Sequence, residues 1–166
     1  LVSDFARARA EWQEVLRLAR RTGDRHAEGG ALVAMGQASC LNHKFGQALE
    51  DSRQATEIAR TIDAPSIHAG SLLNEGFVQL VTGRLTEAWT TFDQTLLLSR
   101  QANDRISEAT ALVFVAELES WEGHYARAAQ VYDEGIQLGR AHNALIPVFE
   151  GVFMAASRAR AHERPL

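Results

Sequence analysis

Histidine and cysteine are the side chains in this sequence that most readily bind metal ions or act in catalysis. They are His26, His43, His68, His124, His142, His162 and the single Cys40. A helical zinc site needs two histidines at i and i+4, or cysteines at a matching ligand spacing. Neither pattern is present, so the sequence predicts no metal centre and no cofactor. Cys40 lacks neighbours that would activate a nucleophile, and we expect a half-buried, unreactive thiol.

The acidic and glycine-containing stretches do not predict catalysis either. Glu117, Glu119 and Glu122 form a short acidic edge without a facing acid or a metal motif, so we interpret them as a solvated helix face. Gly29 and Gly30 follow no strand, and this excludes a phosphate-binding loop at that place. We therefore expect no catalytic residues and no enzymatic activity.

Composition and charge limit the classes of partner. The net charge of −4 is mild, and arginines and lysines are dispersed among acidic residues, so we expect no nucleic-acid-binding surface. No apolar run is long enough to cross a bilayer, so we expect no membrane association. The start of the sequence has no basic segment followed by an apolar core, and a single cysteine cannot form an internal disulfide. These observations favour a cytoplasmic location.

A forty-residue repeat positions these residues. Four columns of equivalent residues show it: one large and apolar, one of alanine, one of arginine, and one of glycine or alanine. They are Phe5, Phe45, Leu85 and Tyr125; Ala8, Ala48, Ala88 and Ala128; Arg20, Arg60, Arg100 and Arg140; and Gly36, Gly76, Ala116 and Ala156. Such a period is typical of a solenoid of helical repeats. The small residues should let paired helices approach closely, and the arginines at helix C-termini should have a structural role.

The hydrophobic pattern within each period predicts helices and no strand. We expect eight helices, at about residues 4–22, 25–42, 45–61, 66–82, 84–101, 105–122, 125–141 and 146–161. Asp4 and Asp24 are suitable N-caps for the first two helices, and Gly23, Gly83 and Gly123 are suitable stops.

The predicted fold class is therefore all-α, a superhelical solenoid of antiparallel helix pairs forming a single domain over residues 1–166. Its units are a half-unit at 1–24, complete units at 25–64, 65–104 and 105–144, and a half-unit at 145–166. The chain begins with Leu1 in a helix that matches the second helix of a unit, so we expect it to be a fragment of a longer protein.

The repeated residues resemble the tetratricopeptide repeat family over about residues 4–161. The third unit has the family's pattern of leucine, asparagine, small residue, turn glycine, large apolar residue, alanine and aromatic residue in Leu72, Asn74, Gly76, Gly83, Leu85, Ala88 and Phe92. The fourth unit matches with Leu112, Ala116, Gly123, Tyr125, Ala128 and Tyr132. The second unit departs from the pattern, with His43 at the turn glycine and Ser52 at the later aromatic residue. The resemblance implies a right-handed superhelix of the forty-residue variety that occurs in bacterial regulatory proteins. HEAT or armadillo repeats are the alternative fold, but they lack the paired glycine and alanine spacing.

The resemblance also implies that the first helix of each unit lines a concave groove. The candidate binding residues on these helices are Val33, Gln37, Leu73, Asn74, Phe77, Val81, Val113, Phe114, Glu117, Trp121 and Phe153. The set is more apolar than a solvated face requires, which favours a groove for an apolar or amphipathic peptide or helix. Asn74, Gln37 and Glu117 would hold the peptide backbone. The alternative is that these side chains pack on the next repeat or on another part of the parent protein.

The sequence thus predicts a non-catalytic scaffold module that binds a protein or peptide ligand. The alternative is a regulatory or sensor segment of a larger signalling ATPase, cyclase or transcription regulator that responds to a peptide or small ligand. A homodimer through the N-terminal or C-terminal helix is a further hypothesis, because Phe5, Trp12 and Leu16 form an apolar stripe that no preceding first helix in this sequence covers.

Overall fold

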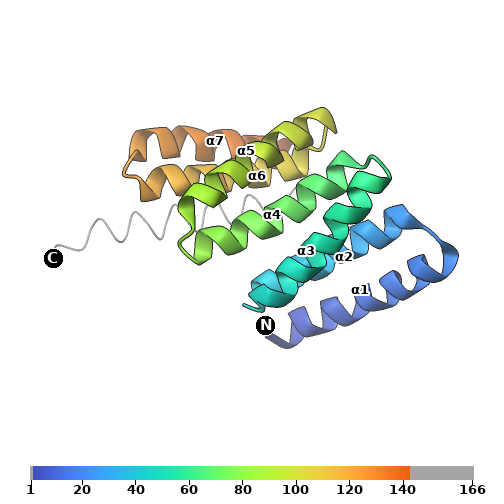
Figure 1. The fold of residues 1–166 in the computed structure, drawn as a ribbon. Helices are drawn as coiled ribbons and strands as arrows, with labels where there is room; N and C mark the ends of the chain where they lie inside the picture. Colours follow the sequence, from blue (N-terminus) through green and yellow to red (C-terminus); the bar gives the residue numbers. More distant parts are fainter. Residues whose placement is uncertain (1, 143–166) are drawn as a thin grey trace.

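The computed structural model describes residues 2–142, with side chains from residue 7 onward. Within that range the chain forms seven α-helices and no strand (Figure 1). They are α1 (Val2–Thr22), α2 (Arg25–Leu41), α3 (Phe45–Thr61), α4 (Pro65–Val81), α5 (Leu85–Gln101), α6 (Arg105–Trp121) and α7 (Tyr125–Ala141). The all-helical prediction is confirmed. The count is seven in the described residues rather than the expected eight, and the helix predicted at about 146–161 lies outside them.

The helices from α2 to α7 are all 17 residues long, and a new one begins every twenty residues. Each turn between helices contains one residue with positive φ, the left-handed region that L-residues other than glycine rarely adopt. These residues are Gly23, His43, Asp63, Gly83, Asn103 and Gly123. The three glycines predicted as stops therefore have a backbone role, and three residues with side chains adopt the same conformation in the other turns.

An aspartate side chain caps the N-terminus of α2 and of α6, each of which is the first helix of a forty-residue unit. The Asp24 carboxylate accepts a hydrogen bond from the Ala27 amide at 2.9 Å, and Asp104 accepts one from the Ser107 amide at 3.1 Å. Each cap satisfies an amide that has no partner inside its helix. The predicted cap at Asp24 is confirmed, whereas the one at Asp4 is wrong because α1 already begins at Val2.

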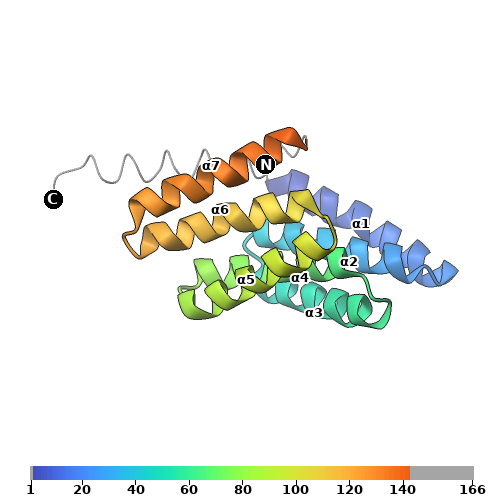
Figure 2. The same cartoon turned by 90° about the horizontal axis from the view of Figure 1, so that it is seen from above.

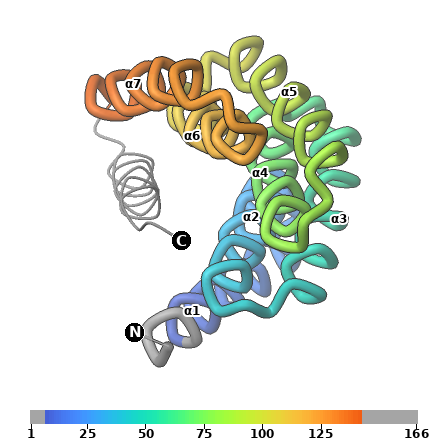
Figure 3. The backbone as a smooth tube through the Cα atoms, turned by 90° about the vertical axis from the view of Figure 1, so that its left-hand side faces the viewer, coloured from blue at the N-terminus to red at the C-terminus, as the bar shows by residue number. Residues whose placement is uncertain are grey.

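The helices pack in order along a curved array (Figures 1 and 2). Each helix contacts the next, and α4 also contacts both α2 and α6, whereas the described helices α3 and α5 do not contact each other. Figure 3 shows the consequence: α2, α4 and α6 lie along the inner side of the arc, and α3 and α5 lie outside. The inner face is thus built from the first helix of each forty-residue unit.

Small residues allow the close helix contacts, as the repeat predicts. Ala48 and Ala88 are fully buried and Ala128 is nearly so. A Cβ atom at Gly76 would lie 2.5 Å from Cε1 of Phe92, so the ring lies directly on the backbone of α4. Close packing of this kind is typical of protein interiors and leaves no room for an added methyl group.

Ion pairs with a buried carboxylate join one unit to the next. Arg9 on α1 donates to the Met35 carbonyl at 3.0 Å and pairs with Asp51 on α3, so it links three helices. Arg20 donates to Glu28 at 2.9 Å, and Arg100 donates to Glu108 at 2.7 Å. Two members of the predicted arginine column therefore connect the end of one unit to the first turn of the next.

Candidate functional site

A cavity of about 170 Å³ opens on the inner face of the array between α2, α4 and α6. Three successive first helices line it with side chains at helical spacing. The lining residues are Val33, Gln37, Cys40 and Leu41 on α2; Gly70, Leu73, Asn74 and Phe77 on α4; and Ile106, Ser107, Thr110 and Phe114 on α6.

From each unit to the next, the lining residues lie about one helical turn closer to the N-terminus of the helix. The last lining residue is Leu41 on α2, Phe77 on α4 and Phe114 on α6, whereas the repeat equivalents of Phe77 are Gln37 and Glu117. The cavity therefore takes the C-terminal half of α2, the middle of α4 and the N-terminal half of α6. Packed helices cross at an angle, so a straight line across three of them meets a different turn on each.

The chemistry of the cavity is neutral and mostly apolar. No charged side chain lines it within the described part of the chain. Its polar side chains already have local partners in three cases: Asn74 Nδ2 donates to the Val33 carbonyl at 3.0 Å, Thr110 to the Ile106 carbonyl at 2.9 Å, and Ser107 to Asp104 at 2.7 Å. Gln37 is exposed at the rim. Such a surface favours apolar groups and offers no counter-charge to an anion or a cation.

An aromatic cluster supports the α6 side of the cavity. The ring of Phe114 stacks on Phe92 with a centroid distance of 5.2 Å and contacts Phe77 at 5.7 Å. Phe77 is half-buried, while Phe92 and Phe114 are buried. Because these rings are fixed by packing on both sides, the cavity wall is preformed and little ordering is needed when a ligand binds.

The structure brings six of the eleven predicted groove residues together in the cavity: Val33, Gln37, Leu73, Asn74, Phe77 and Phe114. Val81 and Trp121 are exposed at the C-terminal ends of α4 and α6, outside the cavity lining. Phe153 lies outside the described residues.

Two of the predicted groove residues lie in the core. Val113 is fully buried, and a Cβ atom at Gly135 on α7 would lie 3.3 Å from its Cγ2 atom, so Val113 faces the partner helix and not the groove. Glu117 is also buried and accepts hydrogen bonds from Tyr132 Oη at 2.6 Å and Trp121 Nε1 at 3.0 Å. The predicted solvated acidic edge is therefore wrong at Glu117, whose carboxylate bonds to two aromatic side chains.

Six cavity residues are absent from the predicted set given above: Cys40, Leu41, Gly70, Ile106, Ser107 and Thr110. Ile106 lies two turns before Phe114 on the same helix face, so extending that stripe toward the N-terminus of α6 would have identified it. Cys40 is buried, and burial raises the pKa of its thiol to about 12. The thiol is thus more buried than the half-buried one expected, and a raised pKa leaves little of the nucleophilic thiolate.

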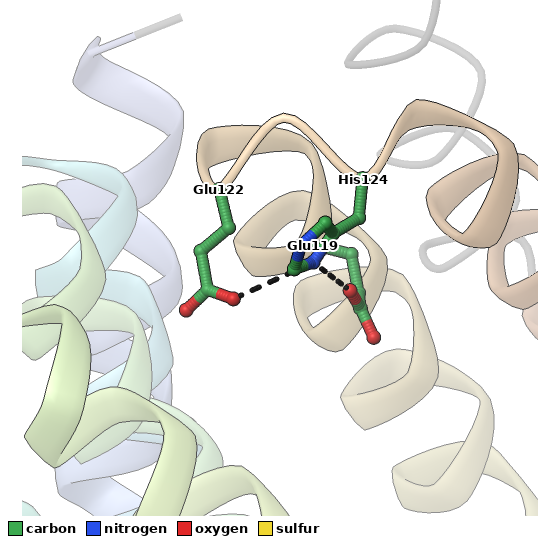
Figure 4. Close-up of side chains that lie close together, drawn as sticks. All are labelled: Glu119, Glu122 and His124. Carbon is green, nitrogen blue, oxygen red and sulfur yellow. Dashed lines mark hydrogen bonds and ion pairs between the residues drawn. The ribbon is translucent and has the colours of Figure 1, made fainter.

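A second group of polar side chains lies at the turn between α6 and α7. Glu119, Glu122 and His124 place their ligand atoms within 4.8 Å of one another (Figure 4). His124 Nδ1 lies 2.9 Å from Glu119 and 3.6 Å from Glu122, and Arg127 lies 3.9 Å from Glu119. Trp89 Nε1 donates to Glu122 at 2.7 Å. Arg127 pairs with Glu119, and the Trp89 indole and the His124 ring contact the same two carboxylates, so the group forms a polar turn that ties α5 to α6.

Comparison with protein-family models finds no match, and no curated protein matches the chain. Among the described residues, no helix has both the length and the apolar character that crossing a membrane requires.

Proposed function

We propose that this protein is a non-catalytic scaffold that binds an apolar segment of a partner protein in the cavity between α2, α4 and α6. The single observation that carries the proposal is the neutral, preformed cavity on the inner face of the array, lined by three successive first helices. An apolar side chain placed there leaves water without leaving a charge unpaired, and that burial provides the binding free energy.

The partner segment that fits best is an amphipathic helix or an extended peptide with apolar residues at regular spacing. The cavity is walled by three helices, so an apolar side chain that enters it would contact all three. Gln37 at the rim offers the amide that would bond to the peptide backbone. As part of the same proposal, the array is a right-handed superhelix of the tetratricopeptide kind that functions in the cytoplasm.

A regulatory segment is a second candidate, favoured by the size and neutrality of the cavity. A closed apolar cavity of about 150 Å³ is sufficient to bind a molecule such as benzene, and this one is about 170 Å³. A small neutral ligand there would contact three units at once and would bias the curvature of the array. Such a response would suit a sensor within a larger signalling protein.

The experiment is selection from a library of random 16-residue peptides displayed on phage, followed by titration of the selected peptides. The test variant is Thr110→Trp, which fills the cavity. The matched control is Thr90→Trp, because both threonines donate to the carbonyl four residues earlier but Thr90 is exposed outside the cavity lining.

We expect selected peptides with apolar residues at helical or alternate spacing. Their affinity should fall by about tenfold or more in Thr110→Trp, since the inserted ring occupies the volume of the ligand, and should be unchanged in Thr90→Trp. Failure to enrich any peptide, or equal binding by both variants, would overturn the proposal.

A further inference from the structure

The turn between α6 and α7 brings an imidazole and two carboxylates together. His124 Nδ1 lies 2.9 Å from Glu119 Oε2 and 3.6 Å from Glu122 Oε2, and one ligand atom from each of the three residues lies within 4.8 Å of the others (Figure 4). Exposed acidic groups often cluster without a bound ion. The types of donor, their spacing and the groups around them therefore decide what this turn can bind.

Of the three turns that follow a first helix in the described chain, this one alone has these donors. In each of them a backbone amide bonds to the carbonyl five residues earlier, as His124 does to Glu119 at 2.9 Å. The equivalent side chains in the other two turns include no carboxylate and no imidazole: Ser39, Asn42 and Lys44 after α2, and Gln79, Thr82 and Arg84 after α4. The backbone shape thus belongs to the repeat, whereas the donor set belongs to this turn.

The distances between the donors suit a small divalent ion. A tetrahedral zinc ion with bonds of about 2.1 Å to nitrogen and oxygen holds its ligand atoms about 3.4 Å apart. The two distances from His124 Nδ1, 2.9 and 3.6 Å, lie on either side of this value. Zinc binds imidazole nitrogen together with carboxylate oxygen, and a site with three protein ligands leaves the fourth position to water.

Groups outside the cluster contact the other oxygen of each carboxylate. Trp89 Nε1 on α5 donates to Glu122 Oε1 at 2.7 Å, and Arg127 Nε on α7 lies 3.9 Å from Glu119 Oε1. Both Oε2 atoms are thus left facing His124. In metal sites, outer groups of this kind orient the ligating carboxylates and strengthen binding of the ion.

The end of α6 favours a cation at the same place. Glu119 lies in the last turn of the helix and Glu122 is its C-cap, and no basic residue lies in that turn. The C-terminus of a helix carries partial negative charge, so it repels acidic side chains and attracts cations. A divalent ion between the two carboxylates offsets this repulsion.

We propose that Glu119, Glu122 and His124 form a zinc site that fixes the turn between α6 and α7. Through Trp89 the site also holds that turn against α5. Helical zinc motifs place two histidines four residues apart. This site does not show that pattern, because Gly123, with a φ of +86°, turns the chain back so that His124 faces Glu119. The site shares no residue with the cavity lining, so this proposal and the proposed function can fail independently.

The probe is Zn²⁺, added to the full chain after treatment with EDTA and without a histidine tag. Calorimetry measures binding, and thermal melting measures the effect of the ion on stability. Co²⁺ in place of Zn²⁺ reports the coordination, because its visible absorption is strong with four ligands in a tetrahedral arrangement and weak with six.

We expect micromolar binding of Zn²⁺, and a melting temperature that rises with Zn²⁺ and returns with EDTA. Glu119→Gln and His124→Asn should each weaken binding by at least about tenfold and remove the thermal shift. Trp89→Phe keeps a ring in the core but removes the donor to Glu122, so it should weaken binding by about tenfold.

Two matched variants serve as controls. His142→Asn changes an exposed histidine at the end of α7, and Trp12→Phe changes an exposed tryptophan on α1, so both should bind Zn²⁺ as the wild type does. Binding that appears only at millimolar Zn²⁺, or that is equal in the wild type, Glu119→Gln and His124→Asn, would overturn the proposal. A loss in His142→Asn as large as that in His124→Asn would also overturn it, because surface histidines in general would then hold the ion.

Discussion

Arg100 Nε donates a hydrogen bond to Glu108 Oε1 at 2.7 Å, across the junction between two units. Arg105 approaches the other carboxylate oxygen at the same distance, so one buried glutamate holds two arginines. Eighty residues earlier, Glu28 is bonded in the same way by Arg20 and Arg25. The repeated arrangement joins the last turn of one helix to the first turn of the next, where the acid also favours the helix dipole.

Replacing Glu108 by glutamine should lower the free energy of unfolding by about 1–2 kcal/mol, because a charge-assisted bond to two arginines is lost at a buried position. Burial raises the pKa of Glu108, but the hydrogen bonds and charges of Arg100 and Arg105 outweigh it and hold the pKa below its ordinary value. The stabilisation is therefore present above about pH 4.5 and is lost as the pH falls through the folded-state pKa.

Urea unfolding at pH 7 and at pH 3 measures this effect. Glu87→Gln is the control, because Glu87 pairs with Arg84 at an exposed site and such pairs contribute little. Similar losses of stability in the two variants at pH 7 would contradict the assigned role of Glu108.

The sequence predicted the positions of these arginines but not their partners. Arg20 and Arg100 belong to a visible forty-residue column, whereas Glu28 and Glu108 are separated by an eighty-residue step, because the unit between them has His68 at the equivalent position. Helix ends were predicted to within two residues for the same reason that the repeat is visible: packing constraints recur in each unit. Because His68 interrupts the column of Glu28 and Glu108, the glutamates do not recur every forty residues and the repeat does not reveal them.

Substitution of Gly76 tests whether α4 and α5 are in close contact at Phe92. Gly76→Ala should destabilise the protein by about 1–3 kcal/mol, because the new Cβ atom would lie 2.5 Å from a buried Phe92 ring. Gly30→Ala is the matched control within another first helix. It has no neighbour within 4 Å, and alanine should stabilise the helix by about 0.5–1 kcal/mol. Thermal melting would contradict this account if both changes had the same sign.

Substitution of Gly83 tests the energetic cost of the positive φ in the turns, because an added side chain there contacts no neighbour. A Cβ atom there meets nothing within 4 Å, but its φ is +79°. Gly83→Ala should therefore cost about 1–2 kcal/mol through backbone strain alone. Gly83→Asn should cost less, because asparagine tolerates this region and Asn103 already adopts it in another turn. Urea unfolding that ranks the two variants equally would contradict the explanation.

The cavity was harder to predict than the fold. Repeat equivalence places Val113 and Glu117 on the groove, but the real cavity moves back one turn on α6, to Ile106 and Thr110. The shift comes from the crossing angles of packed helices, which a linear pattern does not contain. Burial of Glu117 depends on the hydroxyl of Tyr132, a contact between two helices that no spacing within one helix reveals.

The junction between the units at 25–64 and 65–104 differs from the two junctions that contain Glu28 and Glu108. Here His68 stands at the position of the glutamate, near Arg60. Burial lowers the pKa of His68 and the nearby Arg60 charge lowers it further. Its Nε2 atom is buried and has no hydrogen-bond partner among the described residues. Protonation would therefore place a second positive charge beside Arg60 and an unsatisfied donor in the junction.

This arrangement predicts that the protein loses stability in mild acid. The unfolded chain takes up the His68 proton near pH 6.5, the ordinary value, and the folded protein takes it up at lower pH. Between these two values the unfolded state binds more protons, so the free energy of unfolding decreases as the pH falls. Urea unfolding between pH 7.5 and 5 should show this decrease in the wild type, and His68→Gln should reduce it. Arg60→Gln should reduce it only in part, because burial is the larger cause. An unchanged pH dependence in His68→Gln would show that another group is responsible.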